Sequence, residues 1–289
     1  MSPSEPSRRR VDAALLRSWP LPAPGTSKKS RGDVVVVGGA ARSPGGALLA
    51  GRAALRVGAG RLTLAIASSV AVEVAVAFPE CGVVPLRETG RARIRGSALA
   101  AAASDVRQAD AVLLGPGLDD IGETREMLGK LTRLVTREST VVLDAFALGA
   151  LSGRRVPTRN TILTPNKDEA ALLLGRRLRD DQSDIVEIAR RYRAVVTCHN
   201  VVAAPDGRVF LVEGGGPGLG TSGSGDALAG AIAGLAARGC APEQAAVWGT
   251  FLHQAAGASL ARSIAPLGFL ASEIVDRFPY ELAVVERTP

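Results

Sequence analysis

Short, continuously apolar runs recur along the chain from Asp33 onward, and most of them end in glycine, proline or a polar residue. Runs without polar alternation are typical of strands buried on both faces of a parallel sheet. A turn signal, Pro205-Asp206-Gly207, separates the last two runs and predicts an antiparallel hairpin. The predicted strands cover residues 34–37, 62–67, 110–114, 141–143, 161–163, 201–204 and 208–212.

Stretches of helical character lie between these runs, as in α/β proteins. Gly239 and Pro242 are placed as a helix C-cap and a first helical turn, so two helices are expected to close the chain. The predicted helices cover residues 46–57, 122–135, 167–174, 184–192, 226–238 and 242–261.

No linker or repeat divides the chain, so we predict one three-layer α/β domain over residues 31–289, with helices on both faces of a mostly parallel sheet. Residues 1–30 are rich in Ser, Pro and Arg, and we expect a flexible arm there. No apolar run has the length of a membrane span, and none follows the first residues as in a secretory signal. We therefore expect no membrane partner.

Composition narrows the class of ligand. The chain has 35 basic and 28 acidic residues and a net charge of +7, which suits an anionic partner. Aromatic residues make up only 3% of the chain, so few side chains could stack on bases and no nucleic-acid partner is predicted. Cys81, Cys198 and Cys240 are widely spaced and lack metal-ligand spacing, which indicates a reducing, cytoplasmic location.

The densest glycine segment covers residues 214–226 and ends in Gly223-Ser224-Gly225-Asp226. Glycines let successive backbone N–H groups point at one anion, and the positive end of a helix that starts here favours phosphate. Asp226 beside such a site could take a proton from a hydroxyl that attacks a phosphoryl group. The alternative is that Asp226 only caps the helix.

The predicted helix after Asp226 contains Gly230 and Gly234. Each glycine is about 1 kcal/mol less favourable in a helix than alanine, so we expect a neighbour to pack very close to this surface. Close packing of this helix against a neighbour favours a functional role for Asp226 over a role as a helix cap.

These motifs resemble the ADP/ATP-dependent (S)-NAD(P)H-hydrate dehydratase family of the ribokinase-like superfamily. The run from Gly223 to Leu235 is similar to the closing motif of that family, and residues 38–60 are similar to its N-terminal signature. Three further motifs fall in the family's order and spacing: Leu114-Gly115-Pro116-Gly117-Leu118, Leu143-Asp144-Ala145, and Leu163-Thr164-Pro165 followed by Glu169. The resemblance implies a three-layer ribokinase-like fold.

The resemblance also implies an activity, the dehydration of (S)-NADHX or NADPHX with ADP or ATP as co-substrate and Mg²⁺. The implied route is phosphorylation of the ring hydroxyl followed by loss of phosphate. In that scheme Asp226 deprotonates the hydroxyl, while the N–H groups of Gly223, Ser224 and Gly225 form the anion hole for the nucleotide phosphate.

Further site residues follow from the resemblance. Ala47, Gly117 and Asn166 match, with Asp226, the positions that bind NAD(P)HX, although Ala47 and Gly117 could equally serve close packing. Asp144 could hold Mg²⁺ through water or cap the next helix. Glu169 could either be functional or only stabilise a helix dipole, and His253 is expected to be a core histidine. His199 is placed at a strand end that a nucleotide could approach.

The chain departs from the family pattern at four places. Asn166 stands where the family has His, and Phe146 stands where it has a second Asp. The segment Thr197-Cys198-His199-Asn200 replaces a Lys-Gly that embraces the nucleotide phosphates, and an aromatic residue near Gly39 is absent. These departures leave open the choice of ADP or ATP and of NADHX or NADPHX.

Two other functions use the same residues. A small-alcohol kinase of the ribokinase-like superfamily needs the same loop and Asp226, but residues 38–60 favour the dehydratase. A non-catalytic nucleotide-binding regulator would explain residues 197–200, yet it gains nothing from a carboxylate beside phosphate. Because one domain accounts for the chain, the resemblance implies that the NAD(P)HX epimerase is a separate chain. Small-residue helices suggest a homo-oligomer.

Overall fold

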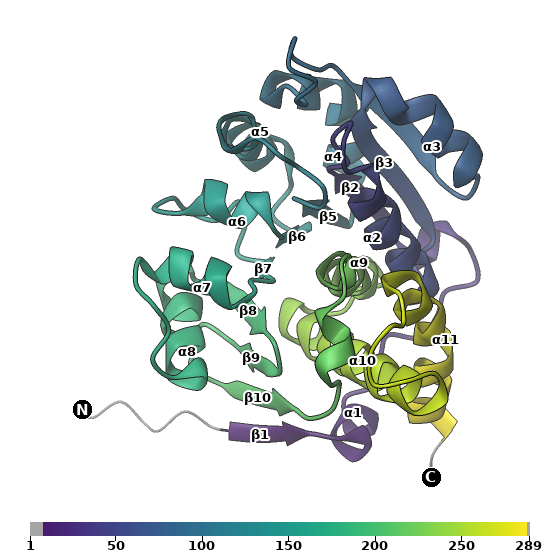
Figure 1. Cartoon of the computed structure of the whole chain (residues 1–289), viewed down its shortest axis with the longest axis vertical. Helices are drawn as coiled ribbons and strands as arrows, with labels where there is room; N and C mark the ends of the chain where they lie inside the picture. Colours follow the sequence, from purple (N-terminus) through teal and green to yellow (C-terminus); the bar gives the residue numbers. More distant parts are fainter. Residues whose placement is uncertain (1–7, 288–289) are drawn as a thin grey trace.

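One ten-stranded sheet runs through the computed structural model, which describes residues 8–287 (Figure 1). The strand order is β1-β10-β9-β8-β7-β6-β5-β2-β3-β4. Strand β9 is antiparallel to both of its neighbours, and the other adjacent pairs are parallel. The strands are β1 Arg8–Val11, β2 Asp33–Val37, β3 Arg61–Ala67, β4 Gly82–Leu86, β5 Ala111–Leu114, β6 Thr140–Leu143, β7 Thr161–Leu163, β8 Val195–Cys198, β9 Val201–Ala203 and β10 Val209–Val212.

Helices cover both faces of this sheet, and each face has its own apolar core (Figure 1). Helices α1, α2, α3, α9, α10 and α11 pack on one face, and α4 to α8 pack on the other. The helices are α1 Ala13–Ser18, α2 Pro44–Arg56, α3 Ala71–Ala77, α4 Ala103–Gln108, α5 Ile121–Leu134, α6 Phe146–Leu151, α7 Lys167–Leu174, α8 Asp181–Tyr192, α9 Ser224–Ala237, α10 Pro242–Ser263 and α11 Ala271–Arg287. The predicted three-layer α/β fold is confirmed.

The continuous apolar runs form strands because both of their faces are covered. In β2, Val34 and Val36 belong to one core, whereas Val35 and Val37 belong to the other. Alternate side chains of a strand point to opposite faces, so a strand between two helix layers needs apolar residues at every position. The predicted hairpin also forms, with β9 antiparallel to β10.

Helices α2 and α9 pack backbone against backbone. A methyl group on Gly230 would lie 2.1 Å from the carbonyl oxygen of Ala50, and one on Gly234 would lie 2.5 Å from that of Ala54. The close neighbour expected for these two glycines is therefore α2. This contact fixes the start of α2 against the start of α9, where the chemistry was predicted.

Within the segment predicted to be a flexible arm, residues 1–30, residues 8–20 contact the rest of the domain, and residues 1–7 lie outside the described part of the chain. Strand β1 pairs in parallel with β10, and the side chain of Leu16 is 0% exposed. The ring of Trp19 stacks on Phe210 at 5.9 Å, and the Gln244 amide donates to the Trp19 carbonyl. These apolar partners lie far along the sequence, so nothing local to the segment indicated that it would dock.

The chain also closes with one more helix than predicted. Helix α11 follows α10 and contains Pro279, which weakens the helical signal in the sequence. Across residues 8–287, no helix combines the length and the apolar character that a membrane span requires.

Candidate active site

Four adjacent parallel strands, β2, β5, β6 and β7, bring the residues that follow them to one edge of the sheet. The amide of Gly39 donates to the Pro116 carbonyl at 2.8 Å, and the amide of Ala40 donates to the Gly117 carbonyl at 2.9 Å. The loops after β2 and β5 are thus joined by hydrogen bonds.

Asp226 is the third residue of α9, and the N-cap of this helix is Gly223. The alternative that Asp226 is only an N-cap is therefore wrong. Among the described residues, its half-buried carboxylate has no hydrogen-bond partner. Burial, with a smaller effect of the nearby Glu169 charge, raises the pKa of Asp226 to about 6. A carboxylate with such a pKa is suited to act as a general base near neutral pH.

The amides at the tip of α9 divide into two groups. Within residues 8–287, the N–H groups of Gly223, Gly225 and Asp226 have no acceptor, so they are available to an anion. The Ser224 N–H instead donates to the Thr221 carbonyl at 3.2 Å. Two of the three predicted anion-hole amides are therefore unpaired, and the amide of Asp226 is a further donor that sequence reasoning missed.

The first turn of α2 and the loop after β5 close around Asp226. A methyl group on Gly46 would lie 2.9 Å from the Gly117 nitrogen and 3.2 Å from Oδ1 of Asp226. Gly117 has a φ of +68°, and its carbonyl accepts a hydrogen bond from the Ser43 hydroxyl at 3.0 Å. The structure thus brings Gly117 close to Asp226.

Ala47 does not take part in the contact of Gly46 with Gly117 and Asp226. Its side chain is 0% exposed, and a methyl group on Gly39 would lie 3.1 Å from the Ala47 Cβ. The methyl group of Ala47 therefore serves close packing.

Asp144 is buried at the end of β6, and its Oδ1 accepts a hydrogen bond from the Thr164 hydroxyl at 2.7 Å. Burial raises the pKa of Asp144 to about 7, against the hydrogen bond from Thr164 and with help from the charges of Asp226 and Glu169. Helix α6 starts without a side-chain cap, so the alternative that Asp144 caps it is wrong. The next residue, Ala145, has a φ of +48°, a strained conformation of the kind found at functional sites.

Asn166 and Glu169 form a reciprocal cap at the start of α7. The Asn166 side chain accepts from the Glu169 amide, and the Glu169 carboxylate accepts from the Asn166 amide, both at 2.9 Å. The prediction that Glu169 stabilises a helix start is confirmed. Because the Asn166 carbonyl oxygen is used in the cap, only its NH₂ group remains to donate to a ligand.

Asp144, Glu169 and Asp226 are the three carboxylates near this edge of the sheet, and they could bind Mg²⁺ only together with a phosphate. Within the described part of the chain, no cluster of three or more His, Cys, Asp or Glu could hold a metal ion. Mg²⁺ is commonly bound by one or two carboxylates, several waters and substrate phosphates. The charges of Asp226 and Glu169 raise the pKa of Asp144, so a cation nearby would relieve their repulsion. Asp144 is therefore suited to bind Mg²⁺ through a water molecule.

Residues 197–200, which replace the family's Lys-Gly segment, are tied to α10. The hydroxyls of Thr197 and Thr250 lie 2.8 Å apart in the core, and the Gln254 amide donates to the His199 carbonyl at 3.3 Å. The side chain of His199 is exposed, and burial raises the pKa of the Cys198 thiol to about 12. This segment offers no lysine, but its backbone is held beside the glycine loop through α10.

His253 is buried as predicted for a core histidine, but it is not fully satisfied. Its Nε2 lies 2.8 Å from Oγ of Ser224 in the glycine loop, whereas its Nδ1 is buried without a partner among the described residues. This contact could not be predicted from the sequence, because the two residues belong to different helices.

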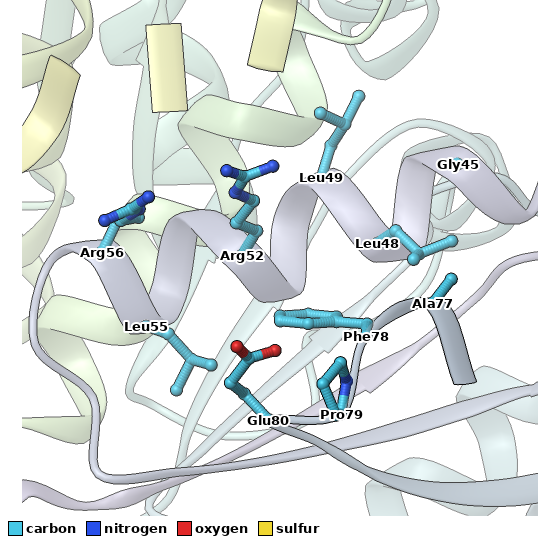
Figure 2. A pocket seen from close by; sticks show the side chains of 10 residues that line it. All are labelled: Gly45, Leu48, Leu49, Arg52, Leu55, Arg56, Ala77, Phe78, Pro79 and Glu80. Atoms are coloured by element: carbon cyan, nitrogen blue, oxygen red, sulfur yellow. The ribbon is translucent and has the colours of Figure 1, made fainter. Parts of the chain in front are cut away.

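A groove of about 690 Å³ lies between α2 and residues 77–80 (Figure 2). Leu48, Leu55 and Phe78 form its apolar surface. Its two arginines, Arg52 and Arg56, both pair with Asp276 of α11. None of the predicted site residues lines this groove, so the reaction is not assigned to it.

Comparisons with known proteins identify the family of the chain. A family model described as NAD(P)H-hydrate dehydratase matches residues 34–279. The chain is 46% identical to the ADP-dependent (S)-NAD(P)H-hydrate dehydratase of Xanthomonas campestris, over 98% of both chains. It is 36% identical to the bifunctional NAD(P)H-hydrate repair enzyme of Moorella thermoacetica, over 97% of this chain but only 55% of that enzyme.

A solved structure has the same fold. The ADP/ATP-dependent NAD(P)H-hydrate dehydratase of Bacillus subtilis, co-crystallised with ATP and Mg²⁺, superimposes with a TM-score of 0.80 at 23% identity, covering 98% of this chain and 99% of that one. A ribokinase-like superfamily protein of Enterococcus faecalis gives a TM-score of 0.81 at 21% identity, covering 96% of each chain. The predicted ribokinase-like fold is confirmed.

Proposed function

The chain belongs to the NAD(P)H-hydrate dehydratase family, and we propose that it catalyses the ADP-dependent dehydration of (S)-NAD(P)HX to NAD(P)H. One observation carries the proposal: the Asp226 carboxylate and the unpaired amides of Gly223 and Gly225 share the tip of α9. A base and an anion hole at one helix N-terminus suit phosphoryl transfer to a hydroxyl. ADP is preferred to ATP in this proposal because the Xanthomonas relative, matched over its whole length, bears that name.

We propose that the hydrated nicotinamide ring lies beside the Asp226 carboxylate, near the first turn of α2 and the loop after β5. Gly46 and Gly117 let this turn and this loop pack directly against one side of the carboxylate, which fixes its position for a ring hydroxyl. The NH₂ group of Asn166 is a donor for the ring's carboxamide, and Ala47 supports the wall from behind. Asp144 would hold Mg²⁺ through water, and the ion would neutralise phosphate charge when bound.

Asp226 accepts the proton of the ring hydroxyl, whose oxygen attacks the terminal phosphorus of ADP. The bond to the bridging oxygen breaks and releases AMP, while the amides of Gly223 and Gly225 stabilise the charge on the transferring group. Phosphate then leaves the ring carbon with the C–O electron pair, and the departing phosphate takes a proton from the adjacent carbon, which restores the dihydropyridine.

The direct test incubates the purified protein with (S)-NADHX, Mg²⁺ and either ADP or ATP, and follows the absorbance of the reduced nicotinamide. We expect recovery with ADP. No recovery with either nucleotide would reject the dehydratase, and release of ADP from ATP with a panel of small alcohols would favour the kinase. Binding of nucleotide without turnover in both assays would favour the regulator.

The base is tested separately with Asp226→Asn. Losing the proton acceptor is expected to lower kcat on the order of 10²- to 10⁴-fold, while the amides continue to bind nucleotide. Unchanged turnover in this variant would show that another group is the base.

We further propose a cytoplasmic location, which three cysteines without disulfides support. An NAD(P)HX epimerase remains a proposed partner in the same pathway, and the chain spans about half the length of the bifunctional repair enzyme of Moorella. A homo-oligomer also remains a prediction, although the small-residue face of α9 that suggested it packs on α2 within the chain.

A further inference from the structure

Helix α9 begins without a side-chain cap although its tip is the proposed phosphate site. Its N-cap is Gly223, in the left-handed conformation with φ of +86°. At most helix starts, a Ser, Thr, Asn or Asp side chain holds the first-turn amides in place. Glycine has no side chain for this role, so a contact from elsewhere in the fold can hold this helix tip instead.

That contact is made by His253 of α10. Its Nε2 lies 2.8 Å from Oγ of Ser224 and 3.1 Å from the Ser224 carbonyl oxygen. The two side chains are only 6% and 4% exposed. Since the Ser224 N–H donates to Thr221, the polar groups of Ser224 are all engaged, whereas the flanking amides of Gly223 and Gly225 are unpaired within the described chain.

The imidazole acts here as a neutral group. Burial lowers the pKa of His253 to about 4, so the ring carries no charge near neutral pH and adds no electrostatic attraction for phosphate. Its Nδ1 is buried without a partner among residues 8–287, which is an unfavourable arrangement for a residue that only fills the core. The favourable interaction of His253 is therefore the contact of its Nε2 with Ser224.

We infer that His253 is a positioning residue of the phosphate site: by fixing Ser224, it aims the amides of Gly223 and Gly225 at the transferring phosphoryl group. The inference rests on the proposed function. Geometry of this kind acts on the transition state more than on ground-state binding, so its loss lowers kcat more than it raises KM.

The test compares His253→Ala and His253→Gln, whose amide reaches toward the position of Nε2. We expect His253→Ala to lower kcat about 10- to 100-fold with less than about a threefold change in KM for ADP, and His253→Gln to recover part of the loss. Because the histidine acts through Ser224, the double variant with Ser224→Ala should be no slower than His253→Ala alone.

The matched control is Ser259→Ala, on the same helix. The Ser259 hydroxyl is 6% exposed and accepts two hydrogen bonds from Arg277, at 2.9 and 2.7 Å, so its loss destabilises α10 without touching the glycine loop. This variant should lower Tm and leave kcat unchanged. Equal loss of kcat in His253→Ala and Ser259→Ala, or additive effects of His253→Ala and Ser224→Ala, would overturn the inference. If even the native protein shows no turnover, the proposed function has failed instead.

An independent observation concerns the opposite edge of the sheet. A hollow of about 930 Å³ lies next to the residues that precede β6, β7 and β8. Asp144 follows β6, so the length of that strand, about 13 Å at 3.3 Å per residue, separates the hollow from the proposed active site. None of the lining residues is acidic, and six of them are arginines: Arg137, Arg154, Arg155, Arg159, Arg191 and Arg193.

These six guanidinium groups form no ion pair within the described part of the chain. Only Arg191 has side-chain partners, since its Nη1 donates to the carbonyls of Leu173 and Leu174. The nearby Arg176, by contrast, pairs with two carboxylates of α8. Six like charges around one hollow repel one another, and a bound polyanion would remove that cost.

The chemistry of the lining selects the ligand. The planar fork of arginine matches phosphate oxygens in a bidentate manner. Val135, Val156 and Pro157 add an apolar wall to the same hollow, which suits the organic part of a small molecule. Its volume lies within the range of small-molecule sites. We propose that this hollow binds a small organic anion that carries two or more phosphate groups.

The test uses inorganic tripolyphosphate as the probe in calorimetric titrations at low and at physiological salt. Replacing Arg154, Arg155 and Arg159 together with Gln should weaken binding at least about tenfold, since several charge-assisted bonds are lost. The control replaces Arg107, Arg125 and Arg262, three exposed arginines that have no ion pair within the described residues. It changes the net charge equally and should weaken binding less than about twofold. Equal weakening in both variants, or none in the first, would overturn the proposal. Dehydratase kcat and KM should be unchanged in both, so this result is independent of the proposed function.

Discussion

Gly46 and Asp226 come from different helices, yet a methyl group on Gly46 would lie only 3.2 Å from Oδ1 of Asp226. The first turn of α2 and the first turn of α9 therefore face each other without an intervening side chain. This close packing fixes the position of the carboxylate.

Gly46→Ala should impair the site because the added methyl group meets the Gly117 nitrogen at 2.9 Å as well as the carboxylate. We expect kcat/KM to fall at least about tenfold, in line with the cost of small displacements at a catalytic centre. The neighbouring Gly45 is the control, since a methyl group there meets nothing within 4 Å. Gly45→Ala should retain kcat/KM, and similar kinetics in the two variants would contradict the prediction.

The pH dependence of kcat/KM should follow the ionisation of Asp226. A general base works only when deprotonated, and burial raises the pKa of this group to about 6. We therefore expect kcat/KM to fall about tenfold per pH unit below pH 6 and to level off above it. The measurement is a pH–rate profile on the free enzyme at subsaturating (S)-NADHX. A profile that stays flat down to pH 5 would rule out this assignment.

Asp226→Asn should stabilise the fold at high pH. Because the pKa of Asp226 is raised from 3.8 to about 6 on folding, the folded state binds more protons than the unfolded state between these values. The free energy of unfolding therefore falls as pH rises through this window, and removing the ionisable group should restore about 1–3 kcal/mol at pH 8. Urea unfolding at pH 8 and pH 4 measures this gain, which should vanish at the lower pH.

Leu16→Ala should destabilise the whole protein although it lies near the N-terminus. Its side chain is 0% exposed in the core shared with α10 and α11, so truncation should cost about 2–5 kcal/mol. The control Leu172→Ala removes a leucine that is 51% exposed and should change the free energy of unfolding by less than about 0.5 kcal/mol. Equal unfolding midpoints would show that the segment is loosely attached after all.

Elements with a local signal were predictable from the sequence, and elements that depend on distant partners were not. The run Val34 to Val37 reads as a buried strand in isolation, because every position is apolar. Strand β1 contains Arg8, Arg9 and Arg10, whose charges suit an exposed edge strand but give no apolar pattern. It becomes a strand only because β10 offers an edge to pair with.

The same distinction applies to the candidate site. Asp226 and the glycines around it could be selected from one short segment, because glycine density and the helix start are local features. The use of the Ser224 amide by Thr221, and the contact between Ser224 and His253, depend on how a loop closes and on which helices become neighbours. Neither follows from residue type or spacing, so both required the three-dimensional structure.

The pairing of Val11 with Val212 has a consequence for synthesis on the ribosome. Strand β1 is synthesised before β10, so it has no partner until residues 209–212 have been made. The three consecutive arginines of β1 disfavour pairing with the same strand of other chains during this interval, because like charges repel one another. This repulsion protects the unpaired strand from aggregation until β10 is available.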